Sequence, residues 1–175
     1  IMPKIIWLLV AVLFALSVIG VEAEERWKLI LDDDLTKHFF DADSIKVVND
    51  NDSDRIYLDV WIKVAYNGTG KGAYRESLRK AKIPTDGYEN FSYAINHLLF
   101  GDGMICLLGV YDYNDTGVIL RSFDSPVRHW LDIVPGSTID LWFQQVMTFA
   151  TANMRTIIER TRDYTEENGY SHNFI

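Results

Sequence analysis

The alternation of side chains between Arg55 and Tyr66 constrains the fold more than any other feature of this sequence. One set of alternate residues is wholly aliphatic: Ile56, Leu58, Val60, Ile62 and Val64. The other set is mixed: Tyr57, Asp59, Trp61, Lys63 and Ala65. A period of two is typical of a β-strand whose side chains point to opposite faces of a sheet. The sequence therefore predicts a strand with one face that needs cover and one face of mixed character.

A second pattern, near the C-terminus, has the period of an α-helix. Ser137 suits an N-cap, and Asp140 follows it at capping-box spacing. Apolar residues then recur three and four positions apart, at Ile139, Trp142, Phe143, Val146, Met147, Ala150, Met154, Ile157 and Ile158. This pattern predicts one long helix that runs to about Glu167 and ends near Asn168 and Gly169. A single sheet covered on one face by this helix gives an α+β fold.

The remaining apolar runs predict further strands, which antiparallel hairpins connect. These runs are Trp27–Leu31, Phe39–Val48, Phe91–Phe100, Met104–Tyr113, Val118–Phe123 and Trp130–Val134. The turn residues Asn114 to Gly117 join two of them in a hairpin. A polar stretch, residues 67–90, lies between the strands, and its glycine-rich start at Gly68 to Gly72 is interpreted as a flexible loop.

The N-terminal residues are typical of an export signal. Lys4 is followed by Ile5 to Ile19, a run whose single polar residue is Ser17. Small residues at Val21 and Ala23 fit a cleavage site after residue 23. The run is short for a transmembrane helix, which needs about 20 apolar residues, although an uncleaved anchor is the competing interpretation. We therefore expect residues 1–23 to be a signal peptide and residues 24–175 to form a single exported domain.

Composition excludes several classes of protein. The chain carries 17 basic and 25 acidic residues, a formal net charge of −8, which argues against nucleic acid as a partner. Its 175 residues suit one domain with an ordinary core. A single cysteine, Cys106, excludes an internal disulfide.

Motifs that carry chemistry are weak in this sequence. Asp50, Asp52 and Asp54 begin like a calcium loop, but Arg55 and Trp61 stand where that loop needs glycine and glutamate. The four histidines (His38, His97, His129 and His172) are scattered and lack the spacing of a zinc site. Asp41 and Asp43 share a predicted strand face and are interpreted as solvated edge residues. We therefore predict no catalytic residue, no metal site and no cofactor, with a secreted hydrolase as a minor alternative.

An ordered set of segments resembles the surface-adhesin protein E family of exported bacterial proteins. The matching segments are Trp27 with its apolar neighbours, Phe39–Ile45, Val60–Lys63, Tyr111–Asp112, Gly117–Ser122 and Trp130–Ser137. The resemblance implies an antiparallel sheet of about six strands with a long C-terminal helix and a tendency to form homodimers. It also implies a non-enzymatic role in binding a protein partner, such as a host matrix protein, at the cell surface or in the periplasm of a Gram-negative-type bacterium.

Two interpretations of the mixed strand face are open. Tyr57 and Trp61 are contact candidates if that face is at the surface, because interfaces are rich in aromatic side chains. Alternatively, the helix covers the mixed face and leaves the aliphatic face for a dimer partner. The alternative function is that of a periplasmic small-ligand-binding protein, with a pocket between sheet and helix lined by Trp142, Phe143 and Met147.

Overall fold

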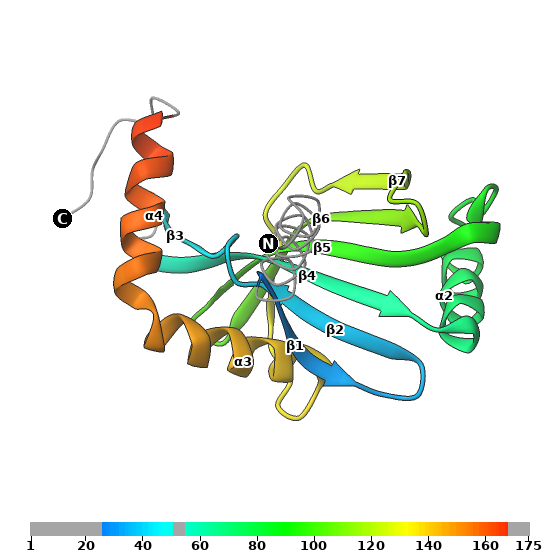
Figure 1. Ribbon diagram of the computed structural model, residues 1–175, viewed down its shortest axis with the longest axis horizontal. Helices are drawn as coiled ribbons and strands as arrows, with labels where there is room; N and C mark the ends of the chain where they lie inside the picture. The colour runs from blue at the N-terminus through cyan, green and yellow to red at the C-terminus, as the bar shows by residue number, and fades with distance from the viewer. Residues whose placement is uncertain (1–25, 51–54, 168–175) are drawn as a thin grey trace, which may run out of the picture.

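Residues Arg55–Tyr66 form one continuous strand, β4, as the alternation predicts. The computed structural model describes residues 26–50 and 55–167, and it confirms the α+β class (Figure 1). The strands are β1 (Trp27–Asp32), β2 (Thr36–Asp41), β3 (Lys46–Asp50), β4, β5 (Phe91–Gly101), β6 (Met104–Asn114), β7 (Ile119–Asp124) and β8 (Trp130–Asp132). The helices are α2 (Gly68–Lys80), α3 (Thr138–Ala152), α4 (Met154–Glu167) and a short 3-10 turn, η1 (Tyr88–Asn90).

The sheet has eight strands in the described residues, more than the six or so expected. Its order is β1-β2-β4-β5-β6-β7, with β3 paired to β4 and β8 paired to β6. The extra strands arise because β4 and β6 are each long enough to pair with two short strands along one edge. β2 and β3 pair with β4, and β7 and β8 pair with β6. The predicted strand Phe39–Val48 divides into β2, which pairs with residues 62–66 of β4, and β3, which pairs with residues 55–59.

The C-terminal helix begins as predicted but is not continuous. Ser137 Oγ accepts a hydrogen bond from the Asp140 amide at 3.1 Å, and Asp140 Oδ2 accepts one from the Gly136 amide at 2.7 Å. The helix divides at Asn153, the C-cap of α3, which has a φ of −119°. The Asn153 side chain donates to the Phe149 carbonyl at 2.8 Å, so it occupies an acceptor at the end of the helix. The two helices, α3 and α4, then run in clearly different directions (Figure 1).

The helices cover the aliphatic face of β4, so the interpretation that they cover the mixed face is wrong. Leu58, Val60, Ile62 and Val64 form one buried cluster with residues of α3 and α4, namely Val146, Ala150 and Ile157. The physical reason is the charge on the mixed face, where Asp59 and Lys63 would lose their hydration under an apolar helix. The aliphatic face is therefore the core and is not available to a dimer partner.

The predicted loop at Gly68 to Gly72 is a helical turn at the start of α2, so that prediction was wrong. Asn67 is the N-cap, and its side chain accepts from the Gly70 amide at 2.8 Å. Gly70 is buried, and a Cβ there would lie 2.3 Å from the carbonyl oxygen of Leu35. Glycine at this position lets α2 approach the chain between β1 and β2. α2 lies at the end of the sheet opposite to α4 (Figure 1).

Two predictions fall on other parts of the chain. The signal peptide and the tip of the loop at residues 51–54 lie outside the described residues. Within 26–50 and 55–167, the structure contains no helix that is both long and apolar enough to cross a membrane.

Candidate binding site

The face of the sheet opposite to the core carries an unusual number of aromatic side chains. The strand register places Trp61 opposite His97 of β5, and it places Lys63 between Phe39 of β2 and Ile95 of β5. We call this surface the open face, because the described helices pack on the other side of the sheet. Its half-buried large side chains are Trp27, Phe39, Trp61, Lys63, Tyr93, Ile95, His97, Tyr111 and Tyr113.

Trp61 is held in a fixed position at the centre of the open face. Its ring stacks on the imidazole of His97 with centroids 4.2 Å apart and an interplanar angle of 7°. Tyr111 of β6, the strand beyond β5, also lies near the indole, with a centroid distance of 5.6 Å. His97 Nε2 is in turn hydrogen-bonded to Asp59 Oδ1 at 2.8 Å. This arrangement presents a pre-ordered indole, which is the kind of rigid anchor that protein interfaces use.

Tyr57, the other predicted contact residue, lies on the same face but is buried, with 2% of its surface exposed. Its ring stacks on Trp130 of β8 with centroids 4.3 Å apart. Tyr57, Leu99 and Cys106 form a small second core beneath Trp130. Of the two predicted residues, Trp61 thus lies half-buried on the open face, whereas Tyr57 is buried and supports one end of that face.

Lys63 is the most unusual charged residue of the open face. Its ammonium lies 4.4 Å from the ring centroid of Tyr93 and 5.7 Å from that of Trp27. These are cation–π distances. Partial burial lowers the pKa of Lys63. Among the described residues no carboxylate forms an ion pair with it, in contrast to Lys37, which is paired with Asp32 at 2.8 Å.

A hollow of about 150 Å³ opens beside Trp61. It is lined by Arg26, Trp27, Asp41, Ser44, Trp61 and Ile95. Asp41, which we predicted to be solvated, is 2% exposed and accepts two hydrogen bonds from Arg26 Nε and one from Arg26 Nη2, at 2.6–3.0 Å. That prediction was wrong because Asp41 ends β2 under the arginine, while Asp43 turns outwards. The hollow thus has two indoles as walls and a neutralised ion pair at one end.

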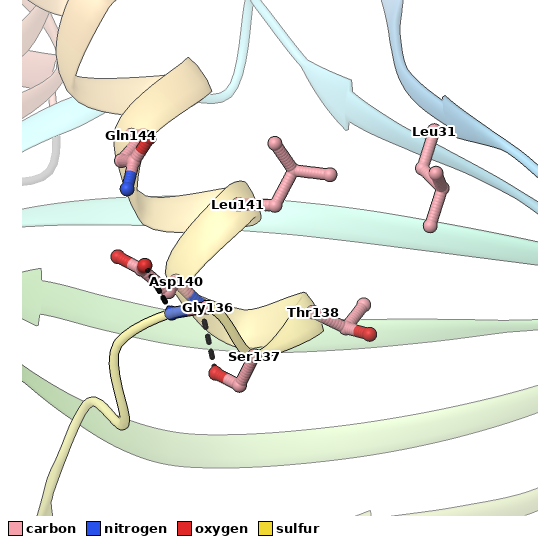
Figure 2. Close-up of a pocket in the computed structure, with 7 residues that line it drawn as sticks. All are labelled: Leu31, Gly136, Ser137, Thr138, Asp140, Leu141 and Gln144. Atoms are coloured by element: carbon pink, nitrogen blue, oxygen red, sulfur yellow. Dashed lines mark hydrogen bonds between the residues drawn. The ribbon is translucent and has the colours of Figure 1, made fainter.

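A larger hollow of about 320 Å³ lies at the N-terminus of α3 and has a different character (Figure 2). Its polar groups are used by the chain itself, since Ser137 and Asp140 satisfy backbone amides at the start of the helix. Leu31 and Leu141 form its apolar part, and both lie apart from the capping hydrogen bonds in Figure 2. We therefore assign this hollow to helix capping.

The side chains predicted to line a ligand pocket between sheet and helix are packed against the core. Trp142, Phe143 and Met147 are partly buried against the main apolar cluster. The Trp142 indole donates to His38 Nδ1 at 2.9 Å, and Phe143 meets Phe100 edge-on at 5.8 Å between centroids. These contacts explain the apolar stripe of α3 without a ligand.

A buried carboxylate, Asp112 on β6, was not foreseen from the sequence. It is fully buried and accepts hydrogen bonds from Tyr74, Tyr88 and Arg121 at 2.6–2.8 Å. Burial and the neighbouring carboxylate raise the pKa of Tyr88 to about 12, so this phenol stays protonated and acts as a donor. The sequence signal for this buried carboxylate was the presence of one acidic residue within a largely apolar strand. Because all its partners are supplied by α2, η1 and β7, this cluster fastens α2 to the sheet.

No family model, curated protein or solved structure matches this chain. The resemblance to the surface-adhesin family therefore stays a prediction.

The described residues also contain no group of three or more histidine, cysteine or acidic side chains that could hold a metal ion. His38 is buried and bonded to Trp142, His97 is bonded to Asp59, and Cys106 is buried. His172 lies outside the described residues. The sequence carries no local signal for the position of Lys63, because the residues that surround it come from strands that are distant in the chain.

Proposed function

We propose that this protein is an exported, non-enzymatic binding protein whose open face receives a protein partner. The observation that carries the proposal is the row of ordered aromatic side chains around Trp61 on a sheet face that no described helix covers. Protein interfaces are enriched in tryptophan and tyrosine, and their strongest contacts come from such rings held in place by neighbours.

Several properties of the open face favour binding over catalysis. Asp59 and His97 are bonded to each other, and His97 is stacked beneath Trp61, so this pair supports the indole. A catalytic acid or base needs a proton acceptor or donor position open to a substrate. Asp112, the most deeply buried acid among the described residues, lies on the opposite side of the sheet and holds α2 in place.

The partner and the compartment follow from the sequence predictions. A signal peptide at residues 1–23 would place the domain in the periplasm or at the cell surface. The family resemblance favours a host matrix protein as partner and a homodimer as the state of the protein. The alternative, a small ligand between sheet and helix, has less support because Trp142, Phe143 and Met147 pack against the core.

A binding assay with matched variants tests the proposal. Residues 24–175 are immobilised, and purified extracellular matrix proteins and the protein itself are passed over them. We expect at least one of these proteins to bind saturably. Trp61→Ala should reduce the affinity about tenfold or more, since an anchoring aromatic side chain contributes at least about 2 kcal/mol of binding free energy. Phe123→Ala serves as the control. It removes an aromatic ring that is 44% exposed and lies on the edge strand β7.

Equal binding by the Trp61→Ala variant would exclude the open face as the contact surface. Circular dichroism spectra and unfolding midpoints of both variants establish that they remain folded. Protease treatment of intact cells then decides the compartment. Digestion places the protein outside the cell, and protection until the outer membrane is opened places it in the periplasm, where a matrix protein is not its partner.

A further inference from the structure

The hollow beside Trp61 has the size of one six-membered ring. Its volume is about 150 Å³, and a cavity of roughly that volume in a protein core holds a benzene molecule. Trp27, Trp61 and Ile95 supply apolar walls. The hollow lies open on the sheet face, so a ring can enter it from a partner without any rearrangement of the core.

The carboxylate and the hydroxyl group that line the hollow are already engaged within the chain. Asp41 is engaged by Arg26, and it also accepts from the Asp43 amide at 3.1 Å. Ser44 Oγ donates to the Asp41 carbonyl at 2.8 Å and accepts from the Trp61 amide at 3.2 Å. A sugar ring needs several free donors and acceptors around its hydroxyl groups, whereas an aromatic ring needs none. The lining therefore favours an aromatic ring.

Lys63 adds a charge requirement beside the hollow. Its ammonium sits over Trp27, one wall of the hollow, and no described carboxylate neutralises it. A partly buried ammonium is costly unless an anion pairs with it, and the lowered pKa of Lys63 reflects that cost. A carboxylate from outside would remove the cost and form a charge-assisted hydrogen bond. Lys63 therefore selects an acidic partner segment by local charge complementarity.

We infer that the hollow between Trp27 and Trp61 receives an aromatic side chain from an acidic segment of a partner protein, with a carboxylate next to that ring bound by Lys63. The inference rests on the proposed function of the open face and specifies the chemistry of the partner. The ring supplies the buried anchor, and the ion pair to Lys63 supplies selectivity for acidic flanking residues.

The test uses blocked five-residue peptides as probes and the ¹⁵N-labelled domain, residues 24–175. One peptide carries phenylalanine between glutamates, a second carries phenylalanine between lysines, and a third replaces the phenylalanine of the first by alanine. We expect the first peptide to shift the indole N–H signals of Trp27 and Trp61 saturably. The second and third should bind at least about tenfold more weakly, because each lacks one of the two required groups.

Variants of two lysines on the same face complete the test. Lys63→Met should weaken the first peptide about tenfold, whereas Lys37→Met should leave it unchanged, because Lys37 already has Asp32 as a partner. Equal affinity of the Lys63→Met variant overturns the inference, as does an absence of saturable shifts. Tighter binding of a glucuronate oligosaccharide at the same indoles would overturn it in favour of an acidic sugar.

The inference and the proposed function fail in different ways. If Trp61→Ala abolishes binding of a matrix protein or of a second copy while Lys63→Met does not affect it, the open face is the interface but the acidic aromatic segment is wrong. If Trp61→Ala has no effect on any partner, the proposed function fails as well.

Discussion

The indole nitrogen of Trp142 on α3 donates a hydrogen bond of 2.9 Å to Nδ1 of the buried His38 on β2. Nδ1 must therefore be unprotonated, and the proton of the neutral imidazole is on Nε2, which lies 2.6 Å from Thr36 Oγ1. Burial lowers the pKa of His38, so the folded protein holds it neutral. The contact fastens α3 to the sheet through a histidine that must stay neutral to accept this hydrogen bond.

We predict that this contact makes the protein less stable in mild acid. Below the unfolded-state pKa of about 6.5, His38 binds a proton in the unfolded chain but not in the folded one. The free energy of unfolding therefore falls as the pH drops below 6.5, by at most about 1.4 kcal/mol per pH unit from this residue. Urea unfolding of the wild type and of His38→Gln between pH 5 and 8 measures how the free energy of unfolding depends on pH. The variant should lose this part of the slope, and an unchanged slope would show that His38 does not contribute.

The Asp112 cluster predicts a graded loss of stability. Arg121→Met removes the cation that pairs with the fully buried Asp112 carboxylate and should cost about 3–5 kcal/mol. Tyr88→Phe removes one charge-assisted hydrogen bond and should cost roughly 1.5–3 kcal/mol. Tyr111→Phe is the matched control, because Tyr111 bonds the exposed Asp124 and should cost less than about 1 kcal/mol. Equal losses in all three variants would contradict a structural role for Asp112.

Two glycines of α2 should respond to alanine in opposite directions. Gly70→Ala places a methyl group 2.3 Å from the Leu35 carbonyl oxygen, so the helix must shift, at a cost of roughly 1–3 kcal/mol. Gly72 has open space around its Cβ position, and alanine there should stabilise the helix by about 0.5–1 kcal/mol. Thermal unfolding of both variants checks the pair. Stabilisation by Gly70→Ala would mean that α2 does not pack against the β1–β2 turn.

The local patterns of this sequence predicted local structure well. Strand β4 has the predicted bounds, because the alternation that identifies a strand involves only consecutive residues. Ser137 caps α3, and Asn114 to Gly117 form the turn between β6 and β7, for the same reason. Asn67 shows the limit of this reasoning, since its capping role depends on Gly70 fitting against Leu35, which is distant in the chain.

The candidate site could be predicted only in part. The alternation placed Tyr57 and Trp61 on one face, but it could not show which face the helices cover. It also could not show that Trp130, on a strand more than 60 positions away, buries Tyr57, or that Trp27 and Tyr93 enclose Lys63. Such contacts depend on strand pairing between distant segments, and a single sequence does not specify that pairing.

The packing of Trp130 over the second core predicts how Cys106 reacts. Cys106 is fully buried beside Tyr57 and Leu99, and burial raises the pKa of its thiol. The thiol should therefore react with a disulfide reagent at pH 8 at least ~100-fold more slowly in the folded than in the urea-unfolded protein. Trp130→Ala opens the cover and should speed the reaction about tenfold or more. Trp61→Ala removes a tryptophan from the same face, but this ring stacks on His97 and does not cover Cys106. This variant should leave the rate of thiol labelling unchanged. Rapid labelling of the wild type would show that β8 does not hold Trp130 over the thiol.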